Sequence, residues 1–248
     1  MKVELLSFDA INSQLSDYWR VSVLDETTST MQAIKSDEIT NWELVAAEFQ
    51  SAGRGRLDRK FDSEKSTGLL FSVFYTPKIK NDLGFISLIA GQTLVEVLRD
   101  LTEDKKYKTK WPNDILHGDN KIAGLLIEYF NDGLIIGIGI NVSNKEEQLP
   151  VSTASSIYLS SNKIIDRNLL LAKICNQLRK NLNLWEQGID FRQAYRETSA
   201  TLGQRVSAKL PGGEELSGIA TDIGSDGTLF IDGAAISVGD IVHLQALK

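Results

Sequence analysis

Four cationic side chains fall within seven residues of this sequence, beside two glycines, and such a density of charge is typical of an anion-binding loop. They are Arg54, Arg56, Arg59 and Lys60, in the stretch SAGRGRLDRKF at residues 51–61. Cations this close repel one another unless an anion or carboxylates neutralise them, and Asp58 and Asp62 supply only part of that charge. A solvated basic turn remains the alternative interpretation.

The two common phosphate-binding patterns do not fit this stretch. Gly53-Arg54-Gly55 begins like a dinucleotide fingerprint, but Asp58 occupies the position of the third glycine and a strand is expected to follow instead of a helix. The sequence also lacks the Gly-Lys-Ser/Thr end of a P-loop. An anion would therefore be bound here in another way.

A second group of polar residues follows in KTKWPNDI at residues 108–115. Pro112 restricts the residue before it to an extended conformation and removes a backbone donor, so a strand should end at this point. Lys110, Asn113 and Asp114 would then lie at the tip of that strand, beside the ring of Trp111. An ordinary surface turn has the same composition, so this stretch alone does not decide between the two interpretations.

Lys121 is the third candidate, because it opens a strand whose next residues include Ala123 and Gly124. These small side chains leave room for a ligand to lie over the strand with its charged end at the lysine ammonium. A solvated lysine at a strand entry is the alternative.

Alternating strands and helices are expected to position these groups. The basic stretch lies between two strands, WELVAAEFQ at residues 42–50 and TGLLFSVFYT at residues 67–76. Apolar residues between 83 and 101 recur at helical spacing, which predicts an amphipathic helix packed on a sheet. The other expected elements are a strand near 21–24, a short helix at 29–38 capped by Thr28 or Ser29, an extended segment at 107–111, and helices at 167–188 and 189–199.

KIAGLLIEYF and LIIGIGINVS, at residues 121–130 and 134–143, are separated by Asn-Asp-Gly and predict an antiparallel hairpin. Alternation places three isoleucines of the second strand on one face and Gly137, Gly139 and Asn141 on the other. Two glycines on one face indicate that a ligand or another element approaches the backbone there.

Beyond residue 199 the chain consists of short apolar segments separated by Gly-containing turns, which predicts a small β-barrel at residues 201–248. A barrel of this size would be marginal alone, so it should pack on the main domain formed by residues 1–200. The fold class expected is α+β.

The composition is that of a globular protein. With 27 basic and 33 acidic residues the net charge is −6, which argues against general affinity for nucleic acid or anionic membranes. No apolar run is long enough to span a membrane and no signal-peptide pattern is present, so a cytoplasmic location is expected. Cys175, the only cysteine, should be buried, and His117 and His243 are interpreted as structural or surface residues.

Taken in order, four motifs of this chain resemble those of the biotin protein ligases. They are GRGR at 53–56, KWPND at 110–114, KIAGLLIE at 121–128 and GIN at 139–141, and the similarity extends from DETTSTM at 25–31 to the C-terminal barrel. The resemblance implies a mixed or antiparallel sheet with helices, like the class II synthetases, followed by an SH3-like barrel. It also implies ATP-dependent attachment of biotin to a lysine of a biotin carboxyl carrier domain, with magnesium as cofactor.

The resemblance further implies roles for individual residues. Lys121 would bridge the biotin carboxylate and the α-phosphate, and Arg54 and Arg56 belong to a loop that closes over both. The residues implied in biotin binding are Ser29, Thr30, Gln50, Gly53, Arg54, Arg56, Lys121 and Gly124. Those implied in ATP binding are Arg54, Arg56, Arg59, Lys110, Trp111, Asn113 and Asn141, with Asp114 near the magnesium ion. Met31, Asp58 and Phe61 depart from the family pattern, where many members have Asn, Gly and Trp, and these departures bear on loop flexibility and nucleotide contacts.

The implied chemistry accounts for the cations. A carboxylate that attacks a phosphoryl group is repelled by about 4 kcal/mol at 4 Å in an effective dielectric near 20, so positive groups must offset that repulsion. The product, biotinyl-AMP, is prone to hydrolysis, and exclusion of water would protect it until a carrier lysine attacks the acyl carbon.

Three alternatives remain at this stage. A lipoate or octanoate ligase or transferase would share the fold, although GRGR with KWPND favours biotin, and a non-enzymatic biotin-binding protein is the second alternative. A DNA-binding repressor is the third, and it is disfavoured because only about twenty residues precede the first strand. The oligomeric state, a homodimer included, is left open.

Overall fold

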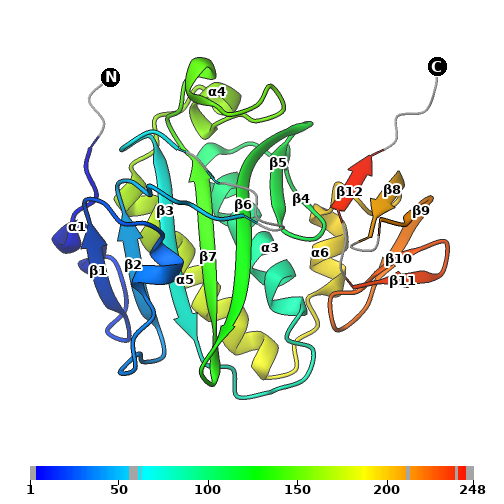
Figure 1. Cartoon of the computed structure of the whole chain (residues 1–248), viewed down its shortest axis with the longest axis horizontal. Coiled ribbons are helices and arrows are strands. Elements are labelled where there is room, and N and C mark those ends of the chain that lie inside the picture. The colour runs from blue at the N-terminus through cyan, green and yellow to red at the C-terminus, as the bar shows by residue number, and fades with distance from the viewer. Residues whose placement is uncertain (1–3, 56–60, 62, 211–212, 238–239, 244–248) are drawn as a thin grey trace.

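The computed structural model describes residues 4–55, 61, 63–210, 213–237 and 240–243. Within these residues the strands form a seven-stranded mixed sheet and a five-stranded antiparallel sheet (Figure 1). Helices accompany the larger sheet, so the expectation of an α+β fold is confirmed.

The larger sheet carries the residues of interest. Its strands, in spatial order, are β1 (Arg20–Leu24), β2 (Glu43–Ala47), β3 (Gly68–Tyr75), β7 (Gly133–Asn141), β6 (Asn120–Phe130), β5 (Asp114–His117) and β4 (Tyr107–Lys110). Only the β1–β2 pair is parallel, and every other pair of neighbours in this sheet is antiparallel. β3 lies between β2 and β7 and is buried along its whole length, which explains its continuous apolar sequence.

Two long helices, α3 (Phe85–Thr102) and α5 (Arg167–Glu186), lie behind the sheet in Figure 1 and pack on each other and on its strands. The shorter α6 (Arg192–Thr198) follows α5. These three helices confirm the sequence prediction. The hairpin β6–β7 is confirmed as well, and its turn contains Asn131 with a positive φ of 49°. Short elements that the sequence did not indicate are α1 (Phe8–Asn12), β5, the 3-10 turn η2 (Glu146–Gln148) and α4 (Ile157–Ser161).

The helix predicted at residues 29–38 is wrong in length, since α2 spans only Thr30–Ala33. Ser29 precedes it in an extended conformation, but its side chain makes no capping hydrogen bond. The backbone N–H of Thr30 is instead bonded by the side chain of Gln50, at 2.6 Å. Ile34, the C-cap residue, packs in a small apolar cluster with Val45, and the helix ends there. One turn of helix is costly by itself, so tertiary contacts fix its extent.

The C-terminal strands form the smaller sheet, as the sequence indicated. Their spatial order is β11 (Ala234–Ile236), β10 (Leu229–Ile231), β9 (Glu215–Ile223), β8 (Arg205–Lys209) and β12 (Asp240–His243). This sheet contacts the main part directly, because the indole N–H of Trp111 donates to the carbonyl of Gly227 at 2.9 Å and the backbone N–H of Trp111 donates to the hydroxyl of Thr201 at 3.0 Å. A domain boundary between residues 200 and 201 and an SH3-like closure stay predictions.

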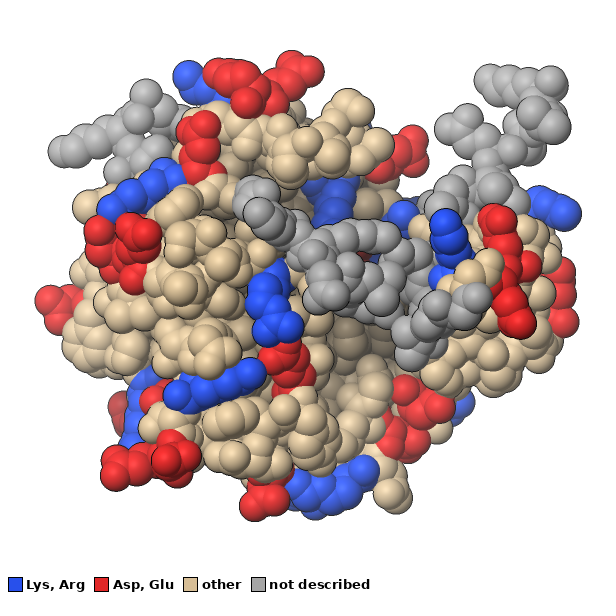
Figure 2. All heavy atoms as spheres, viewed as in Figure 1, with Lys and Arg blue, Asp and Glu red and all other residues tan. Residues whose placement is uncertain are grey.

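The expectations for Cys175 and His117 are confirmed. Cys175 is fully buried and Trp42 and Trp185 lie in the core. His117, the last residue of β5, bonds the carboxylate of Asp104 at 2.8 Å. None of the helices in the described ranges is both long and apolar enough to cross a membrane. On the face seen in Figure 2, basic and acidic side chains are interspersed outside the grey part.

Candidate active site

A pocket of about 370 Å³ lies on the side of the large sheet that carries α2. Residues far apart in the sequence meet in it. Of the predicted site residues, those lining the pocket are Ser29, Thr30, Gln50, Arg54, Lys110, Trp111, Asn113, Asp114, Lys121 and Gly124. Gly53 and Asn141 do not line it, and Arg56, Arg59 and the departure Asp58 lie outside the described residues.

One end of the pocket is built from neutral polar groups. The Thr30 hydroxyl lies 2.8 Å from the hydroxyl of Ser72 on β3. The side-chain oxygen Oε1 of Gln50 accepts from Thr30 N, as described above. Gln50 is positioned by the chain after β2, which continues to pair with the chain after β1: Ser51 N donates to Thr27 O at 2.9 Å. Ser29 and Thr30 are buried. This end therefore presents fixed donors and acceptors to a neutral polar ligand group.

The chain also approaches itself closely beside Gln50. Phe61 N donates to Gly53 O at 3.0 Å, and a Cβ at residue 53 would overlap the carbonyl of Phe61. Glycine is therefore required at position 53 for contact between these two backbone segments, although it does not itself line the pocket.

The opposite end is charged. The Lys121 ammonium lies 2.6 Å from a carboxylate oxygen of Asp114, and their side chains are 41% and 24% exposed. A Cβ built on Gly124 would lie 3.2 Å from the Lys121 nitrogen, so the lysine crosses directly over the glycine. Three residues apart in a regular strand, these side chains would point to opposite faces. They share one face because β6 has a bulge here: its register with β5 shifts between Ile115, opposite Ala123, and Leu116, opposite Lys121.

Two further cations reach the same pocket. Lys110 ends β4, and its ammonium has no hydrogen bond or ion pair with a residue in the described part of the chain. Arg54 lies 3.2 Å from Glu128 in an ion pair and is 52% exposed. Glu128 also pairs with Lys35 at 3.1 Å. Sequence reasoning missed Glu128, although its place at the end of the KIAGLLIE motif marks it as a carboxylate next to the basic stretch.

The KWPND segment forms the turn between β4 and β5. The Asn113 side chain donates to Leu125 O at 2.5 Å, and Leu125 N donates to Asn113 O at 2.9 Å, so the turn is tied to β6. β4 ends before Pro112, as predicted, and the Trp111–Pro112 peptide bond is cis. Trp111 is buried. It lines the pocket, and its indole N–H also bonds the small sheet.

Asp114 is the carboxylate available for a cation in this pocket. Magnesium is usually held by one or two protein carboxylates together with substrate phosphates. The described residues contain no group of three or more His, Cys, Asp or Glu side chains placed to hold a metal. Asp114 therefore fits a magnesium ion that also takes phosphate oxygens, and does not by itself form a metal site.

Asn141 supports the pocket from outside it. Its buried side chain donates to Ser155 O at 3.0 Å. Ser155 N in turn donates to Lys121 O at 2.8 Å, and Lys121 N donates to Thr153 O at 2.8 Å. In this structure Asn141 holds the segment that pairs with the backbone of Lys121.

The glycine face of β7 is covered by two pocket side chains. A Cβ on Gly137 would lie 2.6 Å from the sulfur of Met31, and one on Gly139 would lie 2.6 Å from the ring of Phe61. Met31 and Phe61 are thus the elements that approach this backbone, and both line the pocket. Sequence reasoning noted both as departures from a family pattern but did not connect them with the two glycines. Ile241 of β12 also lines the pocket, and no sequence signal indicated it.

Comparison with known proteins shows what this chain is similar to. Residues 21–143 match the model of the biotin/lipoate A/B protein ligase family. The chain is 31% identical over 242 residues to a biotin–[acetyl-CoA-carboxylase] ligase of Mycobacterium tuberculosis, covering 92% of this chain and 90% of that protein. The structure of a biotin protein ligase of Aquifex aeolicus in complex with biotin and ATP superposes with a TM-score of 0.81 at 28% identity, covering 91% of this chain and 99% of the other. A biotin protein ligase of Leishmania major in complex with biotinyl-5-AMP gives a TM-score of 0.65 at 27% identity, covering 91% and 98%.

Proposed function

This chain belongs to the biotin/lipoate A/B protein ligase family, and we propose that it acts as a biotin protein ligase. In the first step it joins biotin and ATP into biotinyl-5′-AMP, and in the second it transfers the biotinyl group to a lysine of a biotin carboxyl carrier domain. Relatives of similar length carry the ligase name, and one related structure binds both biotin and ATP.

The convergence of Arg54, Lys110 and Lys121 on one pocket carries the proposal. A carboxylate and a triphosphate must approach to bonding distance, and two unit charges 4 Å apart repel by about 4 kcal/mol at an effective dielectric near 20. Cations from β4, from β6 and from the chain beyond β2 offset this repulsion at the same place. The neutral end formed by Thr30 and Gln50 suits the uncharged ring system of biotin.

The first step needs positioning and charge stabilisation and no protein nucleophile. A carboxylate oxygen of biotin attacks the α-phosphorus of ATP, and the bond to the pyrophosphate leaving group breaks. Lys121 stands where it can contact both reacting anions, and Arg54 adds positive charge beside them. By family resemblance, the proposal also includes Arg56 and Arg59 and gives Trp111 and Asn113 a part in ATP binding.

Magnesium belongs to the same proposal, with Asp114 as the protein ligand. The ion would neutralise phosphate charge when ATP binds. Lys121 lies 2.6 Å from Asp114, so the lysine and the carboxylate are held together at the phosphate end of the pocket.

In the second step the uncharged amine of the acceptor lysine attacks the acyl carbon of biotinyl-5′-AMP and AMP leaves. The buried Ser29 and Thr30 and the wall formed by Met31 limit the access of water to the anhydride at its biotin end. The carrier domain is the one macromolecular partner in this proposal; neither DNA nor a second copy of the chain enters it. Because the reaction consumes ATP, the proposal includes a cytoplasmic location for this protein.

Mass spectrometry of a carrier domain tests the function. The domain is incubated with this protein, biotin, ATP and magnesium, and we expect a single biotinyl adduct that disappears when the acceptor lysine is changed to arginine. Lipoate in equimolar competition should leave that adduct unchanged. A lipoyl adduct in its place would reassign the enzyme to the lipoate branch of the family, and biotin binding without any adduct would favour a non-enzymatic binder.

A further inference from the structure

A buried ion pair lies where the segment at residues 48–68 begins and ends; this segment contributes Gln50 and Arg54 to the pocket. Glu48, directly after β2, and Arg167, the first residue of α5, are only 4% and 2% exposed. The two guanidinium nitrogens Nη1 and Nη2 of Arg167 donate to the two carboxylate oxygens of Glu48, at 2.8 and 3.0 Å. These residues are 119 positions apart and neither lines the pocket, so the chemistry proposed above leaves the pair unexplained.

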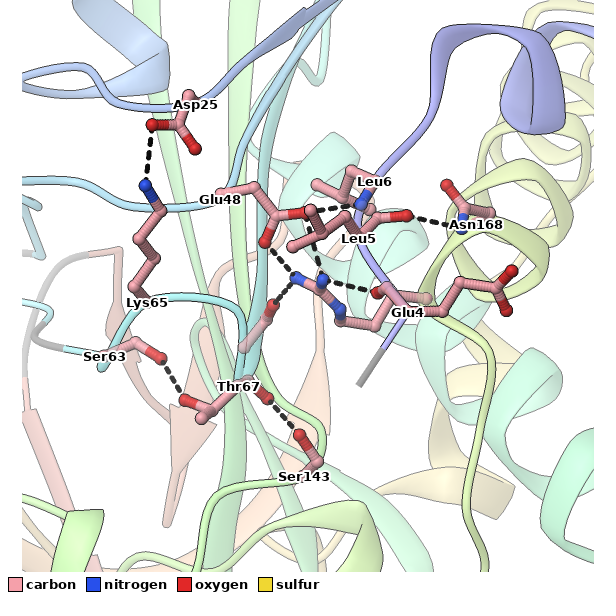
Figure 3. A network of polar contacts seen from close by, with 12 residues as sticks. Glu4, Leu5, Leu6, Asp25, Glu48, Ser63, Lys65, Thr67, Ser143 and Asn168 are labelled. Atoms are coloured by element: carbon pink, nitrogen blue, oxygen red, sulfur yellow. Dashed lines mark hydrogen bonds and ion pairs between the residues drawn. The ribbon is translucent and has the colours of Figure 1, made fainter. Parts of the chain in front are cut away.

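The pair is also connected to two backbone segments, the start of β3 and the N-terminal residues 4–6. Arg167 donates to Gly68 O at 3.1 Å and to Glu4 O at 2.7 Å, and Leu6 N donates to the Glu48 carboxylate. Figure 3 shows Glu48 between the N-terminal segment of Glu4 to Leu6 and the chain that continues to Thr67. Asn168, next to Arg167, extends the connection by donating to Leu5 O at 3.2 Å.

Glu48 and Gly68 mark the two ends of the segment that carries the basic stretch. Glu48 is two residues before Gln50, and its carbonyl accepts from Ser66 N at 3.1 Å. Gly68 begins β3, four residues before Ser72, which bonds Thr30 in the pocket. A single guanidinium therefore fixes the exit from β2 and the entry to β3 relative to each other.

The carboxylate is charged in this arrangement. Burial by itself raises the pKa of Glu48, but the hydrogen bonds from Arg167 and Leu6 outweigh it and bring the pKa below its ordinary value. A buried ion pair contributes little net stability compared with apolar residues of similar volume, so stability alone is a poor reason for one here.

Resting on the function proposed above, we propose that the Glu48–Arg167 pair is a positioning element of the biotin pocket. It holds the two ends of the segment at residues 48–68 so that Gln50 reaches Thr30 N and the polar end of the pocket keeps its geometry. The pair does not touch substrate. It acts through Gln50 and β3, and its loss should appear in substrate binding beyond any loss of stability.

Arg167→Lys and the double variant Glu48→Leu/Arg167→Met separate positioning from stability. The lysine keeps the charge but cannot bond two carboxylate oxygens, Gly68 O and Glu4 O at once. The double variant leaves no buried charge unpaired, so it should recover stability relative to a single replacement. Lys173→Ala is the matched control, because Lys173 lies on the same helix in an exposed pair with Asp100.

Two measurements are made on the full chain at a temperature where circular dichroism shows each variant folded. Calorimetry should show that biotin binds about 10- to 100-fold more weakly to both pair variants, as a misplacement of about 1 Å would cause, and normally to Lys173→Ala. Hydrogen exchange should be faster at Ser66, whose amide bonds to Glu48 across this segment, with the β6–β7 hairpin still protected. It should also be faster at Ser51 and Ala52, whose amides tie the start of the segment to the chain after β1.

Biotin affinity within about twofold of the unsubstituted protein in both folded variants would overturn the positioning role and leave a purely structural pair. Unchanged exchange at Ser51 and Ser66 would overturn it equally. If the unsubstituted protein itself binds no biotin, the proposed function fails, and the exchange comparison still decides whether the pair holds the segment.

Discussion

Lys121→Ala is the substitution that tests the electrostatic argument most directly. The lysine is partly exposed, so the effective dielectric around it is at least the value of about 20 used for surface sites. Its contact with an anion at 4 Å then contributes about 2 to 4 kcal/mol, which corresponds to about 30- to 1000-fold in rate. We expect formation of biotinyl-5′-AMP to slow by a factor in that range.

The loss should fall mainly on kcat. Lys121 opposes repulsion between a carboxylate and a phosphate, and that repulsion is greatest when the two reacting atoms approach in the transition state. Biotin affinity should decline much less. The free energy of unfolding should change by less than about 1 kcal/mol, because the ion pair with Asp114 is partly exposed.

Biotin-dependent exchange between ATP and pyrophosphate measures this step without a carrier domain. Lys163→Ala is the matched control, since Lys163 is 39% exposed and pairs with Glu103 at 3.2 Å but does not line the pocket. An exchange rate for Lys121→Ala within about threefold of the rate for Lys163→Ala would refute the role assigned to Lys121.

Three other predictions follow from the packing and the buried titratable groups. Gly137→Ala should weaken biotin binding by about tenfold in calorimetry, because the new Cβ would push Met31 into the pocket; an unchanged affinity would contradict this geometry. Burial, with a hydrogen bond to a carboxylate, raises the pKa of Tyr75, so the chain should be most stable below the ordinary value of about 10 and lose stability as pH rises above it. Urea unfolding between pH 9 and about 11 should show a shallower decline for Tyr75→Phe, by up to about 1.4 kcal/mol per pH unit, and equal slopes would argue against it. Cys175 is buried with a raised pKa, so thiol reagents should label it only as fast as the protein unfolds, and immediate labelling of native protein would show the core to be open.

Local patterns in the sequence were enough to predict most helices and strands and many of the residues that line the pocket. The hairpin of β6 and β7 and the helices α3, α5 and α6 follow from periodicity and turn residues, because each pattern reports how one element divides between buried and exposed faces. The motifs GRGR, KWPND and KIAGLLIE supplied seven of the ten predicted site residues that line a single pocket. Helix α2 is shorter than predicted, because its extent depends on the hydrogen bond from Thr30 N to Gln50 and on an apolar cluster whose other members are remote in the sequence.

The sequence by itself determined which charges and small residues are present and in which strands they occur. Only the tertiary structure decided that Lys121 lies over Gly124, since a bulge against β5 changes the face to which the lysine points. It also decided that Glu48 is neutralised by Arg167 and that Arg54 faces Glu128. Periodicity describes a segment relative to its own axis, whereas strand register and ion pairs between remote residues depend on which segments pack together.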